Sequence, residues 1–162
     1  DNAMKHELFL WFDYPQLNIT RLNFTKLVMK LYDKMQPDTE LPSGAPYFSD
    51  ECQTDVLSAS ALGIINGYAD GTFRPYQSIT RQEAAVMLDR LYRLLGGTVD
   101  IISKKLYADD AQFGDWARNS VYSMREIDIM HGKDGNRFYP QDGYTGEQAI
   151  VTIERMYAQL QG

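Results

Sequence analysis

A set of apolar residues with the spacing of one helix face occurs three times along the chain. Each set follows a threonine, and these threonines, Thr20, Thr80 and Thr145, lie 60 and then 65 residues apart. Counted from each threonine, the apolar positions coincide at four, eight, eleven and twelve, a spacing that marks one face of an α-helix. The matching residues are Phe24, Val28, Leu31 and Tyr32, then Ala84, Leu88, Leu91 and Tyr92, then Ala149, Ile153, Met156 and Tyr157. The pattern predicts three copies of one helical unit.

The second and third copies carry additional elements before the long helix. Shorter helices are expected around residues 55–62 and 115–127, each followed by a loop rich in glycine and Asp-Gly pairs, at residues 63–75 and 128–140. The first copy preserves only the late part of this pattern, and an aromatic cluster of Phe9, Trp11 and Phe12 stands in the earlier part. Its first helix is therefore expected to be missing or cut away.

Connectors separate the copies. Residues 36–46 carry three prolines without helical periodicity, which indicates an extended segment. Gly96-Gly97 is expected to end the second long helix, and a link to about Leu106 follows. Units of this length cannot bury their own apolar face, so the copies are expected to pack together and to place function at their seams.

The predicted helix starts combine capping residues with a cation. Thr80 and Glu83 form a capping-box pattern, Thr145 and Gln148 form its glutamine version, and Thr20 with Asn23 approximates it. Arg21 and Arg81 directly follow their threonines, although a cation in the first helical turn is mildly unfavourable. A guanidinium beside free helix amides suits an anion, so both arginines are candidate ligand contacts. Salt bridges to surface acids are an equally weighted alternative. Gly146 replaces the arginine in the third copy, so that seam is expected to bind weakly.

Composition and charge exclude several classes of function. The chain has 162 residues, 44% of them apolar, and a net charge of −6, which argues against disorder and against a nucleic-acid partner. No stretch approaches the ~20 apolar residues of a membrane span. The single cysteine, Cys52, rules out an internal disulfide framework and is expected to be a small packed residue.

Catalytic and metal chemistry find little support in the residue pattern. Asp109-Asp110, or Glu83 with Asp89, would serve a cell-wall hydrolase only as two facing carboxyls in a cleft, and a solvated acidic surface is favoured. The loop at Asn66–Gln77 lacks the oxygen ligands of a calcium loop, and His6 and His131 have no partners at metal-ligand spacing. We infer no metal, no cofactor and no catalytic function.

The loop 63–75 followed by Ile79-Thr80-Arg81-Gln82-Glu83-Ala84 closely resembles the S-layer homology (SLH) repeat of bacterial surface proteins. Residues 107–157 resemble a second such repeat, and Thr20 to Tyr32 resemble the end of another. The resemblance implies an all-α, pseudo-threefold bundle of three helical repeats joined by extended linkers and glycine-rich loops. It divides the chain into a partial first repeat at 4–36, a second at 47–96 and a third at 107–160, after residues 1–3, which resemble a cloning scar.

The same resemblance implies a non-catalytic module on the bacterial cell surface. It would bind an anionic, pyruvylated secondary cell-wall polysaccharide and hold an upstream cargo domain of a larger surface protein, with no nucleic acid and no membrane span involved. The site residues it implies are Arg21, Arg81, Thr80, Glu83, Gly67, Asp70, Gly71 and Trp116. The arginines would grip the acidic sugar, the turn at 67–71 would offer amides and the Asp70 carboxylate, and Trp116 would face a sugar ring. A protein-interaction or self-association module remains the alternative.

Overall fold

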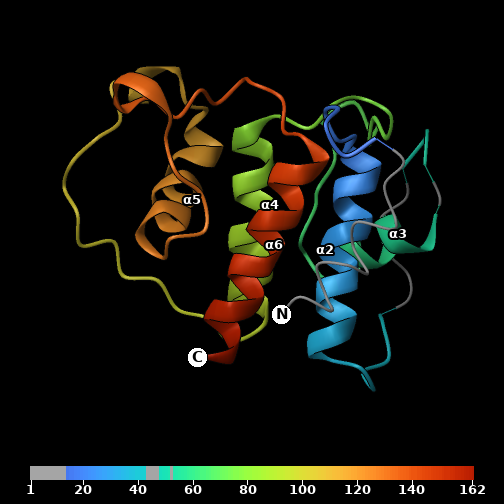
Figure 1. The fold of residues 1–162 in the computed structure, drawn as a ribbon. Coiled ribbons are helices and arrows are strands. Elements are labelled where there is room, and N and C mark those ends of the chain that lie inside the picture. The colour runs from blue at the N-terminus through green and yellow to red at the C-terminus, as the bar shows by residue number, and fades with distance from the viewer. Residues whose placement is uncertain (1–13, 43–47, 52) are drawn as a thin grey trace.

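The computed structural model describes residues 14–42, 48–51 and 53–162. Within these ranges the chain forms α-helices, short 3-10 turns and no extended strand, which confirms the all-α class (Figure 1). The helices are α2 (Arg21–Met35), α3 (Thr54–Ala61), α4 (Arg81–Leu94), α5 (Asp115–Glu126) and α6 (Gly146–Gln161), with 3-10 turns η1 (Asp110–Gln112) and η2 (Asp134–Asn136). The expectations for residues 1–3, for the cluster of Phe9, Trp11 and Phe12, and for Cys52 lie outside the described residues.

The three long helices α2, α4 and α6 make up the middle of the molecule (Figure 1). Helix α2 packs against both α4 and α6, while α3 packs on α2 and α5 packs on α4 at the two sides. The predicted apolar stripes form the core between these helices, because the residues at positions four, eight and eleven of all three copies are fully buried. Burial of each such side chain contributes about 1.5–3 kcal/mol when it is large, so the repeated stripe contributes substantially to stability.

The helix starts follow the predicted capping chemistry. The hydroxyl of Thr20 accepts a hydrogen bond from the Asn23 amide, and Thr80 with Glu83 closes a full capping box. Thr145 and Gln148 close the same box at the start of α6. The two shorter helices lie within one residue of their predicted bounds. The local sequence therefore marks where each of the three long helices begins.

Each long helix also donates two backbone hydrogen bonds to a loop that is distant in sequence. Helix α2 bonds to the loop before α4, helix α4 to the loop before α6, and helix α6 to the loop before α2. The six bonds are 2.8–3.1 Å long. In α2, the amides of Arg21 and Leu22 donate to Gln77 and Pro75, and in α4 those of Arg81 and Gln82 donate to Asp142 and Pro140. In α6, the amides of Gly146 and Glu147 donate to Leu17 and Pro15. The orphan amides of the helix starts are satisfied by these loops.

Two aspartates hold the glycine-rich loops in shape. Asp50 accepts hydrogen bonds from the amides of Phe73 and Arg74, and Asp109 accepts them from Phe138 and Tyr139. Arg74 and Tyr139 adopt φ angles of 59° and 58°, a conformation that non-glycine residues rarely take without support. Asp109 is 3% exposed, so the expectation of a solvated surface acid at this position is wrong. Its carboxylate is a structural clamp.

No helix in the described part of the chain has the length and apolar character of a membrane span. Within the same residues, no three His, Cys, Asp or Glu side chains gather in a way that would hold a metal ion.

Candidate functional site

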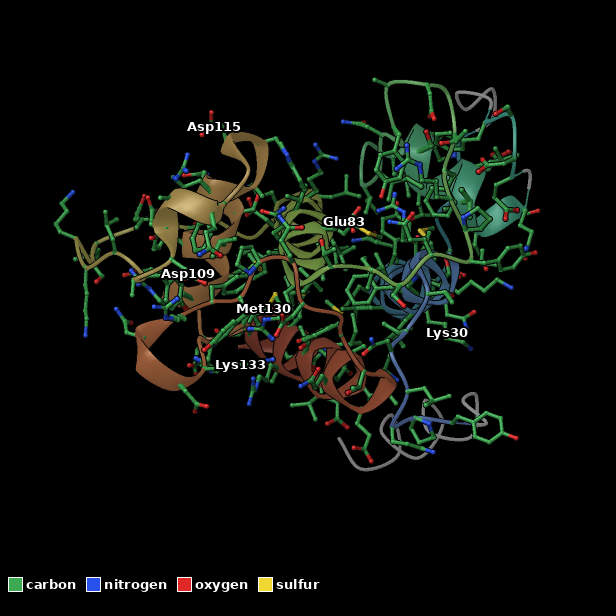
Figure 2. The ribbon with its side chains drawn as sticks, turned by 90° about the horizontal axis from the view of Figure 1, so that it is seen from above. Lys30, Glu83, Asp109, Asp115, Met130 and Lys133 are labelled. Carbon is green, nitrogen blue, oxygen red and sulfur yellow. The ribbon has the colours of Figure 1, made fainter. Side chains whose placement is uncertain are left out.

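A groove of about 500 Å³ lies between the start of α2, the loop at residues 64–69, helix α4 and the start of α5. Figure 2 shows Glu83 of α4 at the centre of the molecule, between α5 and α2. The groove is lined by Arg21, Ile64, Ile65, Asn66, Gly67, Tyr68, Ala69, Glu83, Val86, Met87, Arg90 and Trp116. It therefore brings together residues from all three copies of the sequence pattern.

The carboxylate of Glu83 is the centre of the polar network in this groove. It pairs with the guanidinium of Arg21, accepts a 2.7 Å hydrogen bond from the Tyr68 hydroxyl, and accepts the Thr80 amide at 3.0 Å. Desolvation, and then the hydrogen bond to Glu83, raise the pKa of Tyr68 to about 12. The network is thus charge-compensated, with Tyr68 held as a neutral phenol at physiological pH.

Arg21 is bound on several sides. It is 7% exposed, its Nε donates to the Phe73 carbonyl at 2.9 Å, and its guanidinium lies 4.6 Å from the ring centroid of Tyr68. Together with the ion pair to Glu83, these contacts fix the side chain in the groove wall. Arg21 therefore lines the groove, but its charge is already neutralised by Glu83.

Arg90 is the second arginine of the groove, and its positive charge is not neutralised by an ion pair as that of Arg21 is. Its Nη1 donates to the Ile64 carbonyl at 3.3 Å, and with the Asn66 amide turned to satisfy both of its ends, Nη2 donates to the Asn66 side-chain oxygen at 3.2 Å. No carboxylate of the described residues pairs with this guanidinium. Glu83 is the one acid lining the groove, against two arginines, so the groove carries one uncompensated positive charge.

An apolar wall lies beside this charge. Trp116, in the first turn of α5, is 61% exposed, and Val86 and Met87 of α4 contribute to the lining. A large aromatic side chain left in solvent has no role in the core. A half-buried guanidinium next to an exposed indole suits a ligand that combines a negative charge with an apolar face.

Four of the eight residues predicted from sequence line this groove, namely Arg21, Gly67, Glu83 and Trp116. Thr80 acts as the N-cap of α4. Asp70 turns into its own loop, where it accepts hydrogen bonds from the amide and hydroxyl of Thr72, and these bonds lower its pKa. The Gly71 amide donates to the Tyr68 carbonyl within the same turn. Asp70 and Gly71 are therefore engaged in shaping the loop.

Arg81 lies at a different seam from the groove. It is 5% exposed, its Nε donates to the Phe138 carbonyl at 2.8 Å, and its Nη2 donates to the His131 carbonyl at 2.6 Å. Burial lowers its pKa. Arg21 makes the equivalent Nε bond to Phe73. The cation in the first helical turn thus has a structural role in α2 and α4, because its Nε bond connects the helix start to the loop before the next long helix.

Sequence reasoning missed Tyr68 and Arg90. A signal for Arg90 existed in the repeat pattern, because the residue ten positions after each threonine is a cation: Lys30, Arg90 or Arg155. The apolar stripe drew attention to the buried face of the helix and away from this position at its edge.

Comparison with known proteins identifies a family for part of the chain and relatives over most of its length. The family described as "S-layer homology domain" matches residues 49–85. Over 146 residues, 86% of this chain, it is 32% identical to an exoglucanase, XynX, of Acetivibrio thermocellus, of which it covers 13%. Over 145 residues, 87% of this chain, it is 29% identical to a cellulosome-anchoring protein of the same species, of which it covers 32%.

A surface layer protein of Brevibacillus choshinensis is 29% identical over 111 residues, 68% of this chain and 10% of that protein. The chain thus spans a third or less of the length of these curated relatives. The shared part is the helical module with its loop and helix-start motif. The chain contains an S-layer homology domain, at residues 49–85, and its relatives indicate a location on the bacterial cell surface.

Proposed function

We propose that this chain is a non-catalytic anchoring module that binds an anionic, pyruvylated secondary cell-wall polysaccharide without a covalent bond. The observation that carries the proposal is the uncompensated guanidinium of Arg90 in a groove walled by the exposed indole of Trp116. The relatives support the setting, since they include a cellulosome-anchoring protein and a surface layer protein.

The chemistry of the ligand follows from the two walls of the groove. The carboxylate of a pyruvyl acetal would accept two hydrogen bonds from the Arg90 fork, an arrangement about twice as strong as neutral hydrogen bonding. The apolar face of the sugar ring would stack on Trp116. Arg21 would contribute its remaining polar edge while it stays paired with Glu83.

The net charge of −6 makes long-range attraction to an acidic polymer weak. Binding therefore depends on local pockets, and a polymer with many identical repeats raises the effective concentration of each one at the groove. We expect modest affinity for a single repeat and much tighter retention on an intact wall.

Several features support a module without catalysis. A glycoside hydrolase needs two carboxyls that flank the scissile bond, and the groove offers Glu83 alone, already engaged with Arg21 and Tyr68. The relatives named as glucanases align with this chain over 13% and 15% of their length. That short aligned part is the shared helical module.

We further propose that the chain is a pseudo-threefold bundle of repeats at 4–36, 47–96 and 107–160. The cycle of hydrogen bonds from each long helix to the loop before another supports this arrangement. The fully buried residues at equivalent positions of α2, α4 and α6 support it as well.

The proposal is tested by co-sedimentation with purified cell-wall sacculi, before and after acid extraction of their non-peptidoglycan polymer. Arg90→Ala and Trp116→Ala are expected to lower binding about tenfold or more, because each removes one wall of the site. Arg137→Ala is the matched control, since Arg137 is an exposed arginine outside the groove. Binding that survives extraction, or that Arg90→Ala leaves unchanged, would contradict the proposal.

A protein-interaction or self-association module is the second candidate. Tyr14, Leu17 and Tyr76 favour it, because these large side chains are 66%, 58% and 77% exposed. In that case light scattering would show self-association that Tyr76→Ser reduces, while Arg90→Ala would have no effect on it.

A further inference from the structure

A second cavity, of about 540 Å³, lies between the connector at residues 101–106 and helix α5. It is lined by Ile101, Ser103, Lys104, Lys105, Leu106, Asp115, Arg118, Asn119 and Tyr122. None of these residues lines the groove described above. The cavity is therefore a separate site, formed by the connector to the third copy and one face of α5.

The connector is held in place against this helix. The amide of Tyr107 donates to the Tyr122 hydroxyl at 3.0 Å, and the Leu106 carbonyl accepts a 3.0 Å hydrogen bond from the side chain of Asn136. Within the connector, the Lys105 amide donates to the Ser103 hydroxyl at 3.4 Å. These bonds give the wall of the cavity a defined shape without any ligand.

The cavity carries an excess of positive charge. Arg118 is already paired with Asp115 and Asp110 of the same region. The ammonium groups of Lys104 and Lys105 form no ion pair with the described residues, and both side chains are exposed. Figure 2 shows side chains of this connector reaching outward beyond α5, some of them tipped with nitrogen. Two cations are thus available to an anionic ligand.

The rest of the lining offers the groups that a saccharide uses. Asn119 and Ser103 supply an amide and a hydroxyl for sugar hydroxyl groups, and Leu106, which is 59% exposed, supplies an apolar surface. The combination of free cations, neutral polar groups and one apolar face matches an acidic sugar better than an inorganic ion, which would leave the apolar face unused.

The cavity and the groove both take lining residues from helix α5. Trp116 lines the groove and Asn119 lines the cavity, and residues three apart are neighbours on a helix surface. We propose that the cavity is a second subsite for the acidic wall polysaccharide, so that one polymer strand contacts the groove at Trp116, crosses the start of α5 and places another acidic sugar between Lys104 and Lys105. This inference rests on the proposed function, since it assumes the same ligand.

The two-subsite arrangement makes the affinity depend on polymer length. A strand long enough to fill both subsites gains the second contact as an intramolecular event, whereas a fragment that fills only one does not. The unmodified chain should therefore prefer long strands, and loss of the lysines should remove this preference.

The test compares binding to sacculi of Acetivibrio thermocellus and to the acid-released polymer, separated into long and short fragments. Lys104→Ala/Lys105→Ala is expected to weaken binding of long fragments about tenfold and to leave short fragments within about twofold. Lys26→Ala/Lys34→Ala removes the same charge from α2, outside both sites, and should match the unmodified chain. Lys104→Arg/Lys105→Arg should keep most of the binding.

A second readout separates this inference from the proposed function. Long fragments at high concentration should still shift the backbone amide NMR signals of Ser103 and Asn119 in Arg90→Ala, because the cavity does not depend on the groove. If Arg90→Ala abolishes binding while the double lysine variant equals its control, the inference is wrong and the proposed function stands. If the unmodified chain binds neither sacculi nor polymer, both are wrong.

Discussion

Arg21 and Arg81 occupy the same position of the repeat motif, yet their surroundings differ. Both donate through Nε to a loop carbonyl, but Arg21 also pairs with Glu83, whereas Arg81 donates to a second carbonyl, that of His131. Local sequence predicts the same role for both arginines because the Thr-Arg motif is identical. Their environments depend on residues about 50 to 60 positions away, which the motif does not contain.

The candidate site was predictable to the extent that its residues belong to that motif. Arg21 was found in this way, and Gly67, Glu83 and Trp116 were found through the family resemblance. Arg90 was missed because its role depends on the packing of loop 64–69 against α4, where the Ile64 carbonyl accepts its hydrogen bond. Arg90 is a candidate ligand contact because no carboxylate of the described residues pairs with it, and only the folded structure shows this.

Arg81→Ala tests the structural role of the buried arginine. The variant removes hydrogen bonds to the carbonyls of Phe138 and His131 and the packing of the guanidinium over the Phe138 ring. We expect a loss of about 2–4 kcal/mol in the free energy of unfolding, measured with urea. Arg81→Lys should restore only part of it, because an ammonium lacks the planar fork. A change within ~0.5 kcal/mol, as at an ordinary surface position, would contradict this role.

The helices themselves were the most predictable part of the fold. Their apolar stripes and caps are local features, since Thr80 and Glu83 lie within one turn of each other. The hydrogen bonds that hold the glycine-rich loops were not predictable from local pattern, because Asp109 accepts them from amides about 30 residues away. A carboxylate that satisfies two backbone donors looks the same in the sequence as a solvated one.

The first turn of helix α4 contains a glutamate, Glu83, that has two roles, capping and charge compensation. Helix α6 carries Gln148 at the equivalent position and closes the same capping box, which shows that the cap does not need a charge. The charge of Glu83 instead serves Arg21 and Tyr68. The two tasks can therefore be separated by one substitution.

Glu83→Gln is expected to keep the cap and lose the ion pair with Arg21, at a cost of about 1–3 kcal/mol in the free energy of unfolding. The pKa of Tyr68, about 12 in the native groove, should fall toward its ordinary value of 10, because the carboxylate acceptor is gone. A raised pKa contributes stability below pH 10 that is lost as the pH rises through about 12. The variant should thus show a smaller alkaline loss of stability.

The readouts for this variant are urea unfolding between pH 7 and 12 and phenolate absorbance. Tyr68→Phe is the control, since its alkaline loss of stability should shrink in the same way while the cap and the ion pair remain. An unchanged tyrosine titration in Glu83→Gln would contradict the assigned hydrogen bond.

Backbone hydrogen bonds between copies connect the three long helices in a cycle. Each long helix is capped by a loop that precedes another long helix, and α6 closes the cycle by donating to the carbonyls of Leu17 and Pro15. No copy satisfies the first two amides of its own long helix, so removal of any one copy leaves unpaired amides and an uncovered apolar stripe in the others. We infer that the chain unfolds as one cooperative unit although its sequence is built from repeats.

Gly146 lies at this closure, close to the backbone of the loop before α2. A Cβ at this position would lie 3.0 Å from the Pro15 carbonyl oxygen and 3.1 Å from its Cα, backbone atoms that have little freedom to move. Gly146→Val is therefore expected to lower the free energy of unfolding by about 1–3 kcal/mol through overpacking. Helix propensity offsets little of this cost, because valine is only slightly better than glycine in a helix.

The measurement is denaturant unfolding followed by both Trp fluorescence and far-UV circular dichroism. The two probes should give coincident transitions in the unmodified chain and in Gly146→Val, with the midpoint lowered in the variant. Separate transitions would show that α6 leaves the bundle independently, which would contradict the cooperative cycle. An unchanged midpoint would mean that the loop at residues 15–17 yields at no cost, so that the contact at Gly146 does not hold the third copy to the first.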